Sequence, residues 1–320
     1  MKDIKVVFMG TPSFSVPILE KLIENTNVIM VVFQPDKEKD RKGNIVFPET
    51  KKLAIEHNIE VYQPRKIREE FEYILDKNPD IIITCAYGQI LPREILEYPK
   101  YGCINVHGSL LPKLRGGAPI HHAIINGDKV TGITIMYMDS KMDSGDIISQ
   151  REVEIKRSDN LDSLYSKMSI TGSELLIDTL PSIIDGTNNR IKQDESKVTF
   201  GFNITKEDEI INFNDKAINI FNKVRGLDSV PGASTYFDGK RLKIYKVSVT
   251  DKVSKDIPGQ IVDIEKYGLV VATNDYLIKV LEIKLEGKKR CMVSEYLNGV
   301  QNKKELIGKV LTDGRREENI

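Results

Sequence analysis

Short apolar runs alternate with helix-like stretches over the first half of the chain. Five runs have the composition of buried β-strands: residues 4–9, 27–33, 59–63, 80–86 and 103–108. Four stretches between or after them predict helices: residues 16–23, 49–58, 67–77 and a segment that begins at Pro119. Strands that alternate with helices predict an α/β fold, with a doubly wound, mostly parallel, Rossmann-like sheet covered on both faces. Such folds place their sites at the carboxyl ends of the strands.

The pattern changes near residue 190. Residues 190–206 are polar and lack sustained periodicity, which predicts a linker. A helix-like segment at 216–225 precedes closely spaced alternating runs: 233–239, 241–249, 259–268, 269–275 and 276–285. Short strands joined by Gly and Asn-Asp turns predict a second, smaller β-barrel that is OB-like. We therefore expect one domain at 1–189, a linker at 190–206 and a β-rich domain at 207–320.

Composition narrows the classes of protein. Of the 320 residues, 40% are hydrophobic, and 47 basic side chains balance 47 acidic ones, so polyanion binding requires local patches. The longest apolar run, 28–33, is too short to span a bilayer, and no signal-peptide pattern precedes the first strand. Three scattered cysteines exclude a disulfide framework. We expect a cytoplasmic protein with no membrane association.

Common cofactor motifs are missing. The first strand-to-helix turn reads GTPSFS, so it lacks the glycines that admit a dinucleotide pyrophosphate, and no P-loop sequence occurs. His121 and His122 are adjacent and cannot share one helix face, and the thiols are isolated. We therefore expect no bound metal.

Polar residues gather after two neighbouring strands. Asn105 and His107 alternate along the run CINVH, so their side chains project from the same face. The segment SLLPKLRGGAPI that follows has the prolines and glycines of a binding loop. A further strand at 131–138 precedes three carboxylates, and we expect it to bring them to the same sheet edge: Asp139, Asp143 and Asp146.

These residues carry a family resemblance. HGSLLPKLRGGAPI, with Asn105 two residues before His107 and Asp143 in KMDSGD, resembles the signature of the 10-formyltetrahydrofolate-dependent formyltransferases. Further similar segments follow in the expected order over about residues 4–311: VVFMGTPSFSVPILEKL, AYGQILP, TGITIMYM, KEDEIINF, VPGAST and GKK. Gly117 stands where the family usually has Ala, and no Trp occurs where the family often has one near Phe213 and Pro231.

The resemblance implies a catalytic role for three residues. Formyl transfer from a reduced folate to a primary amine passes through a tetrahedral intermediate, whose oxyanion needs hydrogen-bond donors. Asn105 can donate one hydrogen bond, and protonated His107 can donate a second. Asp143 is the natural partner of His107 and a candidate relay for the proton of the amine.

The same resemblance implies where the donor substrate, 10-formyltetrahydrofolate, binds. Apolar side chains and backbone amides of two loops suit its flat rings and its amide edge. The residues concerned are Ser109, Leu110, Leu111, Pro112, Gln89, Ile90 and Leu91.

Similarity in the second domain implies that the acceptor is initiator methionyl-tRNA, and we separately expect a monomer. Five basic residues are candidates for phosphate contact: Arg41, Lys42, Lys243, Lys288 and Lys289. Two alternatives stay open at this point. One is a formyltransferase that acts on an amino sugar or another small amine, and the other is a non-catalytic RNA-binding module.

Overall fold

The computed structural model describes residues 1–36 and 46–314. The chain packs into two compact units. The first comprises residues 1–119, 130–154 and 164–203, and the second comprises residues 120–129, 155–163 and 204–320. Most of the predicted linker, residues 190–203, therefore packs within the first unit. Two short segments that lie in the first predicted domain, 120–129 and 155–163, pack with the second unit instead.

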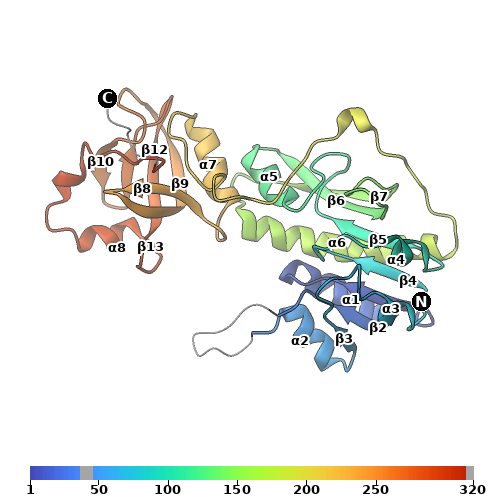
Figure 1. Ribbon diagram of the computed structural model, residues 1–320. Helices are drawn as coiled ribbons and strands as arrows, with labels where there is room; N and C mark the ends of the chain where they lie inside the picture. Colours follow the sequence, from blue (N-terminus) through green and yellow to red (C-terminus); the bar gives the residue numbers. More distant parts are fainter. Residues whose placement is uncertain (37–45, 315–320) are drawn as a thin grey trace. The chain divides into compact units, whose positions relative to one another are not determined.

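The first unit is built on a mixed sheet (Figure 1). Within the described residues it has seven strands in the order β3-β2-β1-β4-β5-β6-β7. The strands are β1 (Lys5–Met9), β2 (Asn27–Val32), β3 (Glu60–Tyr62), β4 (Ile81–Thr84), β5 (Cys103–His107), β6 (Val130–Tyr137) and β7 (Ile147–Glu154). Strands β1 to β5 pair in parallel, whereas β6 and β7 are antiparallel to their neighbours. The predicted doubly wound, mostly parallel sheet is confirmed.

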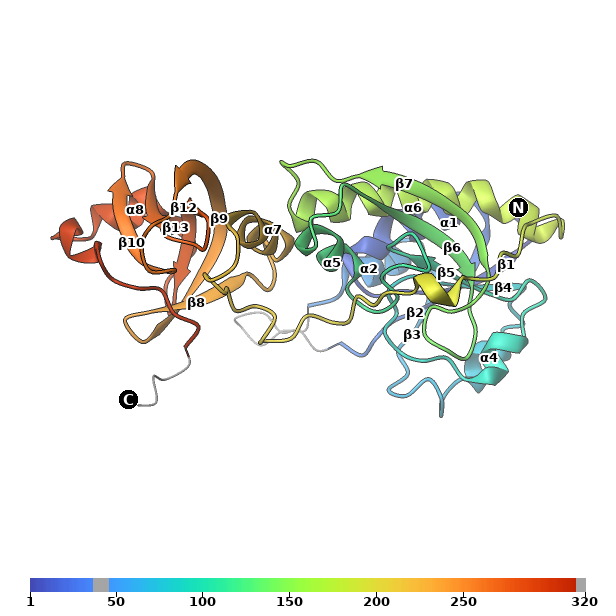
Figure 2. The ribbon, with the colours of Figure 1, turned by 90° about the horizontal axis from the view of Figure 1, so that it is seen from above.

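Helices cover both faces of this sheet. They are α1 (Val16–Asn25), α2 (Glu49–Glu56), α3 (Glu72–Leu75), α4 (Arg93–Glu97) and α6 (Leu161–Ile184), whereas α5 (Pro119–Ile125) lies in a segment that packs with the second unit. Ile74 of α3 and Ile95 of α4 join one apolar cluster, which also contains Cys103 of β5. Helix α6 packs on the opposite face, where Gly172 lies so close to Val106 that an added Cβ would come within 3.2 Å of its methyl group. Figure 2 shows α6 along β7, and Ser149 and Thr179 join the two by a 2.6 Å hydrogen bond.

The direction of β6 corrects one expectation. Tyr137, at the end of β6, pairs with Ile104 near the start of β5, because the two strands are antiparallel. The residues after β6 therefore leave the sheet at the end where β5 begins. The prediction from the sequence placed them instead at the carboxyl end of β5. Asp143 reaches β5 only because the loop between β6 and β7 folds back toward it.

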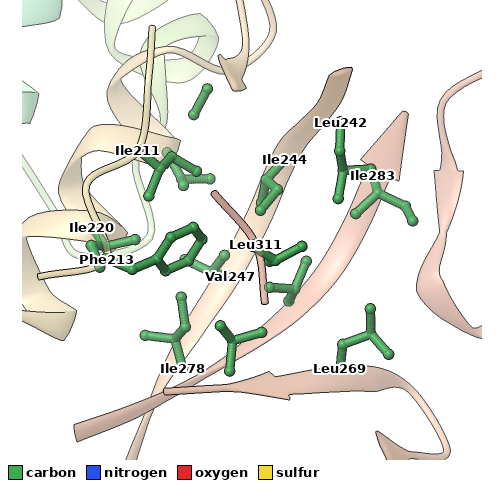
Figure 3. Close-up of a cluster of buried hydrophobic side chains, with 14 of the residues drawn as sticks. Ile211, Phe213, Ile220, Leu242, Ile244, Val247, Leu269, Ile278, Ile283 and Leu311 are labelled. Atoms are coloured by element: carbon green, nitrogen blue, oxygen red, sulfur yellow. The ribbon is translucent and has the colours of Figure 1, made fainter. Parts of the chain in front are cut away.

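The second unit is an antiparallel sheet in the order β10-β11-β12-β9-β8, with β13 beside β12. Its elements are α7 (Ala217–Gly226), β8 (Ala233–Phe237), β9 (Lys240–Val253), β10 (Ile261–Glu265), β11 (Gly268–Val271), β12 (Tyr276–Leu285), β13 (Cys291–Met292) and α8 (Val293–Asn298). Residues 309–312 bond to Tyr236 of β8 and to Ile261 of β10, so they join the two edges. Figure 3 shows the enclosed core, where Phe213 and Ile220 pack with Ile244 and Ile278. A separate strand-rich domain is thus confirmed.

Candidate active site

Strand β5 presents Asn105 and His107 on the face away from α6. Val106 lies between them and contacts α6, so the alternation of a strand turns its two neighbours to the other face. Cys103 on that face packs under α4, while Asn105 and His107 lie further along the strand toward its carboxyl end. Two loops, 109–118 and 138–146, meet these side chains.

The amide of Asn105 is oriented by the neighbouring strand. Thr84 of β4 is its register partner, and the Thr84 hydroxyl donates to Asn105 Oδ1 at 2.9 Å. Because the amide oxygen is occupied, the Nδ2 group faces the other way, and it lies 3.4 Å from Asp143 Oδ1. Asn105 is half-buried. The amide N–H groups of Asn105 therefore point toward the Asp143 carboxylate.

The ring of His107 is buried and its tautomer follows from its partner. Nε2 lies 3.1 Å from the carbonyl oxygen of Leu114, which can only accept, so Nε2 carries a hydrogen. Nδ1 lies 3.8 Å from Asp143 Oδ1, which is too long for a hydrogen bond. In the neutral ring Nδ1 is consequently the nitrogen without a hydrogen, and it faces Asp143.

Asp143 is the carboxylate that reaches the strand. Its Oδ2 accepts a 2.8 Å hydrogen bond from the backbone N–H of Gly116. Gly116 has φ +119°, and an added Cβ would lie 2.9 Å from the Gly201 carbonyl oxygen, so only glycine fits there. Asp139 instead accepts from Lys141 N, and Asp146 pairs with Arg190. Of the three predicted carboxylates, Asp143 alone contacts Asn105 or His107 through a bond or ion pair recorded for the described residues.

The loop after β5 is fixed by polar side chains of β6 and β7. Thr134 donates to the Ser109 carbonyl at 2.6 Å and accepts from Leu111 N at 3.1 Å. Gln150 donates to the Leu111 carbonyl at 2.9 Å. The Ser109 hydroxyl donates back to the Lys113 carbonyl at 2.6 Å. The binding loop is thus held in one conformation by hydrogen bonds to the sheet.

The residues predicted to hold folate differ in how much they expose. Leu111 packs in a buried cluster, and Leu91 belongs to the core under α3 and α4. Gln89 turns its side chain inward, where Oε1 accepts from Ile67 N at 2.9 Å. Ile90 is 64% exposed and offers the largest free apolar surface of this set. Ser109 is buried, whereas Leu110 and Pro112 are half-buried.

The residues predicted to contact tRNA also differ in their exposure and in their charge partners. Lys288 and Lys289 are exposed in the turn between β12 and β13. Lys243 donates to the Pro231 carbonyl and lies 3.5 Å from Glu209 Oε2, so its charge is used within the second unit. Arg41 and Lys42 lie outside the described residues.

Several residues that shape the site were not predicted. Thr84 ends the strand next to Asn105, and strand pairing of β4 with β5 would have indicated it. Gln193, which donates to the Asp143 carbonyl, lies in the predicted linker, where no periodic signal marks it. Arg115 is buried and bonds to Gln193 and Glu195, so it fixes a loop.

The described residues limit the chemistry of the site. They contain no group of three or more His, Cys, Asp or Glu side chains placed to hold a metal ion. Burial raises the pKa of the Cys85 thiol, at the end of β4, to about 12, so it stays protonated and is not a nucleophile near neutral pH. No helix in the same part of the chain is long and apolar enough to cross a membrane. The side chains that meet at the end of β5 are N–H donors beside a carboxylate and an imidazole.

Such a set suits acyl transfer to an amine, and comparison with known proteins identifies the class. The family model described as formyl transferase matches residues 4–180, and the model described as formyl transferase, C-terminal domain, matches residues 203–301. The chain belongs to the formyl transferase family, as the resemblance in its sequence indicated.

Particular relatives extend this result. The methionyl-tRNA formyltransferase of Staphylococcus aureus (strain MW2) is 47% identical over 310 residues, which cover 96% of this chain and 99% of the relative. The structure of an N-formyltransferase from Helicobacter canadensis, solved with folinic acid and dTDP-3-aminofucose, aligns with a TM-score of 0.65 at 20% identity and covers 87% of this chain and 98% of that chain. HypX from Aquifex aeolicus, solved with tetrahydrofolic acid, aligns at 0.62 and 16% identity and covers 92% and 46%. These two structures show that the fold is shared.

Proposed function

We propose that this protein transfers a formyl group from 10-formyltetrahydrofolate to the α-amino group of initiator methionyl-tRNA. The observation that carries the proposal is 47% identity to a methionyl-tRNA formyltransferase across both family domains, and not across the first alone. In this proposal residues 1–189 bind folate and perform the transfer, residues 190–206 connect the domains while most of them pack on the first unit, and residues 207–320 contact the tRNA. A cytoplasmic location and a monomeric state belong to the same proposal.

The site geometry supports the chemistry of such a transfer. Asn105 Nδ2 and His107 Nδ1 converge on one side of Asp143, at 3.4 and 3.8 Å from the same carboxylate oxygen. A substrate oxygen seated between them receives two hydrogen bonds once the ring is protonated, as the oxyanion of a tetrahedral intermediate requires. Asp143 accepts the proton that the attacking amine must lose, and N10 takes up a proton as its bond to the formyl carbon breaks and tetrahydrofolate leaves. The hydrogen bond from Gly116 holds the other carboxylate oxygen in place meanwhile.

The experiment that tests this function compares acceptors. The purified protein is incubated with 10-formyltetrahydrofolate and, in separate reactions, with methionyl initiator tRNA, free methionine and a nucleotide-linked amino sugar. We expect formyl-methionine on the tRNA and little product from the other two. Asp143→Asn should lower turnover by roughly a hundredfold or more, because the amide cannot accept the proton. Turnover on the amino sugar alone would replace the tRNA proposal, and tRNA binding without any turnover would indicate a binding module.

A further inference from the structure

Residues 191–201 lie against both loops of the candidate site. Ile191 pairs with Ile147 at the start of β7 through two backbone hydrogen bonds of 2.8 and 2.9 Å. Further on, Arg115 N donates to the Thr199 carbonyl at 2.9 Å, and Gly201 N donates to the Arg115 carbonyl at 2.8 Å. A segment whose sequence predicts a linker is therefore part of the wall around Asp143.

One side chain in this segment joins the two loops. Gln193 Nε2 donates to the backbone carbonyls of Asp143 at 2.8 Å and of Gly145 at 2.9 Å. Gln193 Oε1 accepts a 3.0 Å hydrogen bond from Arg115 Nε. Both amide hydrogens and the amide oxygen are thus engaged, and no other side-chain type offers two donors and an acceptor in this planar arrangement at this length.

Asp143 is consequently held at two points. Its backbone is held directly by Gln193. Its carboxylate is held by the N–H of Gly116, which follows Arg115. Arg115 is 5% exposed, and its guanidinium bonds to Gln193 and Glu195. Asp143 has φ +48°, a left-handed conformation that residues other than glycine rarely adopt. Without the bond from Gln193, the loop can relax away from this conformation and carry the carboxylate with it.

We propose that Gln193 is a positioning residue for the formyl transfer, which acts by fixing Asp143 against Asn105 and His107. This inference rests on the proposed function, because it gives Gln193 no task unless Asp143 takes part in the reaction. It predicts that Gln193 affects the turnover number and leaves folate binding unchanged, since Gln193 bonds to the loop that carries Asp143 and, in the loop 109–118, only to Arg115, beyond the predicted folate residues 109–112.

Two substitutions separate this role from a general structural one. Gln193→Glu keeps an oxygen for Arg115 but places a carboxylate oxygen against two carbonyl oxygens. Gln193→Met keeps the length and loses all three bonds. Both should lower kcat roughly ten- to a hundredfold, as expected when a catalytic group is displaced by about 1 Å, with the KM for folate changed less than about twofold. Lys192→Ala, an exposed neighbour, is the matched control and should behave like the wild type.

A double-mutant cycle shows whether Gln193 acts through Asp143. The Asp143→Asn variant keeps the backbone carbonyl that Gln193 binds but lacks the carboxylate. Adding Gln193→Met to it should therefore lower kcat less than about twofold further, whereas independent roles would multiply. A normal kcat in Gln193→Glu, or full multiplication in the double variant, would overturn the proposal. Wild-type turnover in Asp143→Asn alone would overturn the proposed site and this inference together. A lower melting temperature with unchanged kcat would assign Gln193 a structural role only and would equally overturn it.

Discussion

Two neighbouring groups decide which way the Asn105 amide faces. Thr84 Oγ1 also lies 3.3 Å from the Ile104 carbonyl, so the same hydroxyl lies between two acceptors on β5. The flipped amide would leave its oxygen facing the Asp143 carboxylate, which repels it, so the carboxylate and the Thr84 hydroxyl together favour the observed orientation. The donor that the reaction needs is therefore preset before any substrate binds.

We predict that Asn105→Ala lowers kcat by roughly a hundred- to a thousandfold, because one oxyanion donor typically contributes this much. Folate affinity should stay within about twofold, since the lost bond forms mainly in the transition state. Single-turnover formylation and equilibrium folate binding measure the two quantities. Thr84→Val serves as a comparison. It keeps the Asn105 amide but removes a hydrogen bond that orients it, so kcat should fall less than in Asn105→Ala. A kcat near the wild-type value in Asn105→Ala would remove Asn105 from the reaction.

The sequence predicts some residues of the candidate site and not others, and this difference has a physical cause. Asn105 and His107 follow from strand alternation, and the structure does bring Asp143 to both. Gln193 could not be predicted, because its importance depends on two carbonyls 48 and 50 residues away in sequence. Contacts between an irregular segment and backbone atoms leave no pattern in residue type. The catalytic roles themselves stay predictions.

At the scale of elements, α6 shows why a long helix can escape detection. Its exposed positions recur about every four residues, at 162, 166, 170, 174 and 178, as an amphipathic helix requires. The apolar pattern is blurred, however, because Ile170 lies on the exposed side while Ser169, Ser173 and Thr179 are buried. Gly172 also interrupts the apolar pattern, because its missing side chain allows α6 to lie close to β5. Neither α6 nor β7 was predicted from the sequence.

The direction of a strand is a second property that local pattern does not contain. Residues 131–138 have the same apolar character whether they run parallel or antiparallel to β5. The sequence therefore predicted the strand correctly and placed its end at the wrong edge. Pairing partners such as His107 with Thr134 are what settle the direction, and these are tertiary contacts.

Helix α5 carries a histidine whose titration should affect stability. His121 is half-buried, and its desolvation lowers its pKa below the ordinary 6.5; the charge of His122 acts in the same direction, whereas a hydrogen bond with the Val230 backbone opposes the shift. The unfolded state then binds the proton more readily, so the free energy of unfolding falls as the pH drops from about 6.5 through the folded pKa. We predict that His121→Gln makes this loss shallower, measured by denaturant unfolding at pH 8 and pH 5.5.

The matched control for that prediction is His57→Gln, which replaces an exposed imidazole at the end of α2. It should leave the pH dependence as it is in the wild type. Parallel curves for His121→Gln and the wild type would show that other groups cause any acid loss.

At the scale of the whole molecule, the balance of 47 basic and 47 acidic residues means that contact with a polyanion must be local. The second unit neutralises much of its own charge. Arg241 and Lys243 face Glu209, and Arg290 binds Glu282 at 2.6 Å and lies over the Tyr245 ring. Arg290 thus anchors the end of the turn in which Lys288 and Lys289 stay exposed. Residue type alone could not separate these roles, because all five side chains are basic.

This difference leads to a prediction about salt. If Lys288 and Lys289 each contact a phosphate, the slope of log affinity against log salt concentration should be about 1.5 smaller for Lys288→Ala/Lys289→Ala than for the wild type, because each contact contributes about 0.7–0.9. Folate affinity should respond little to salt in either protein.

Lys303→Ala/Lys304→Ala removes the same charge from exposed positions elsewhere in the second unit and should keep the wild-type slope. Lys243→Ala should instead lower the melting temperature, because Glu209 loses a partner. Filter binding of methionyl-tRNA over a salt series measures the slopes, and equal slopes in all four proteins would show that the turn between β12 and β13 does not touch the tRNA.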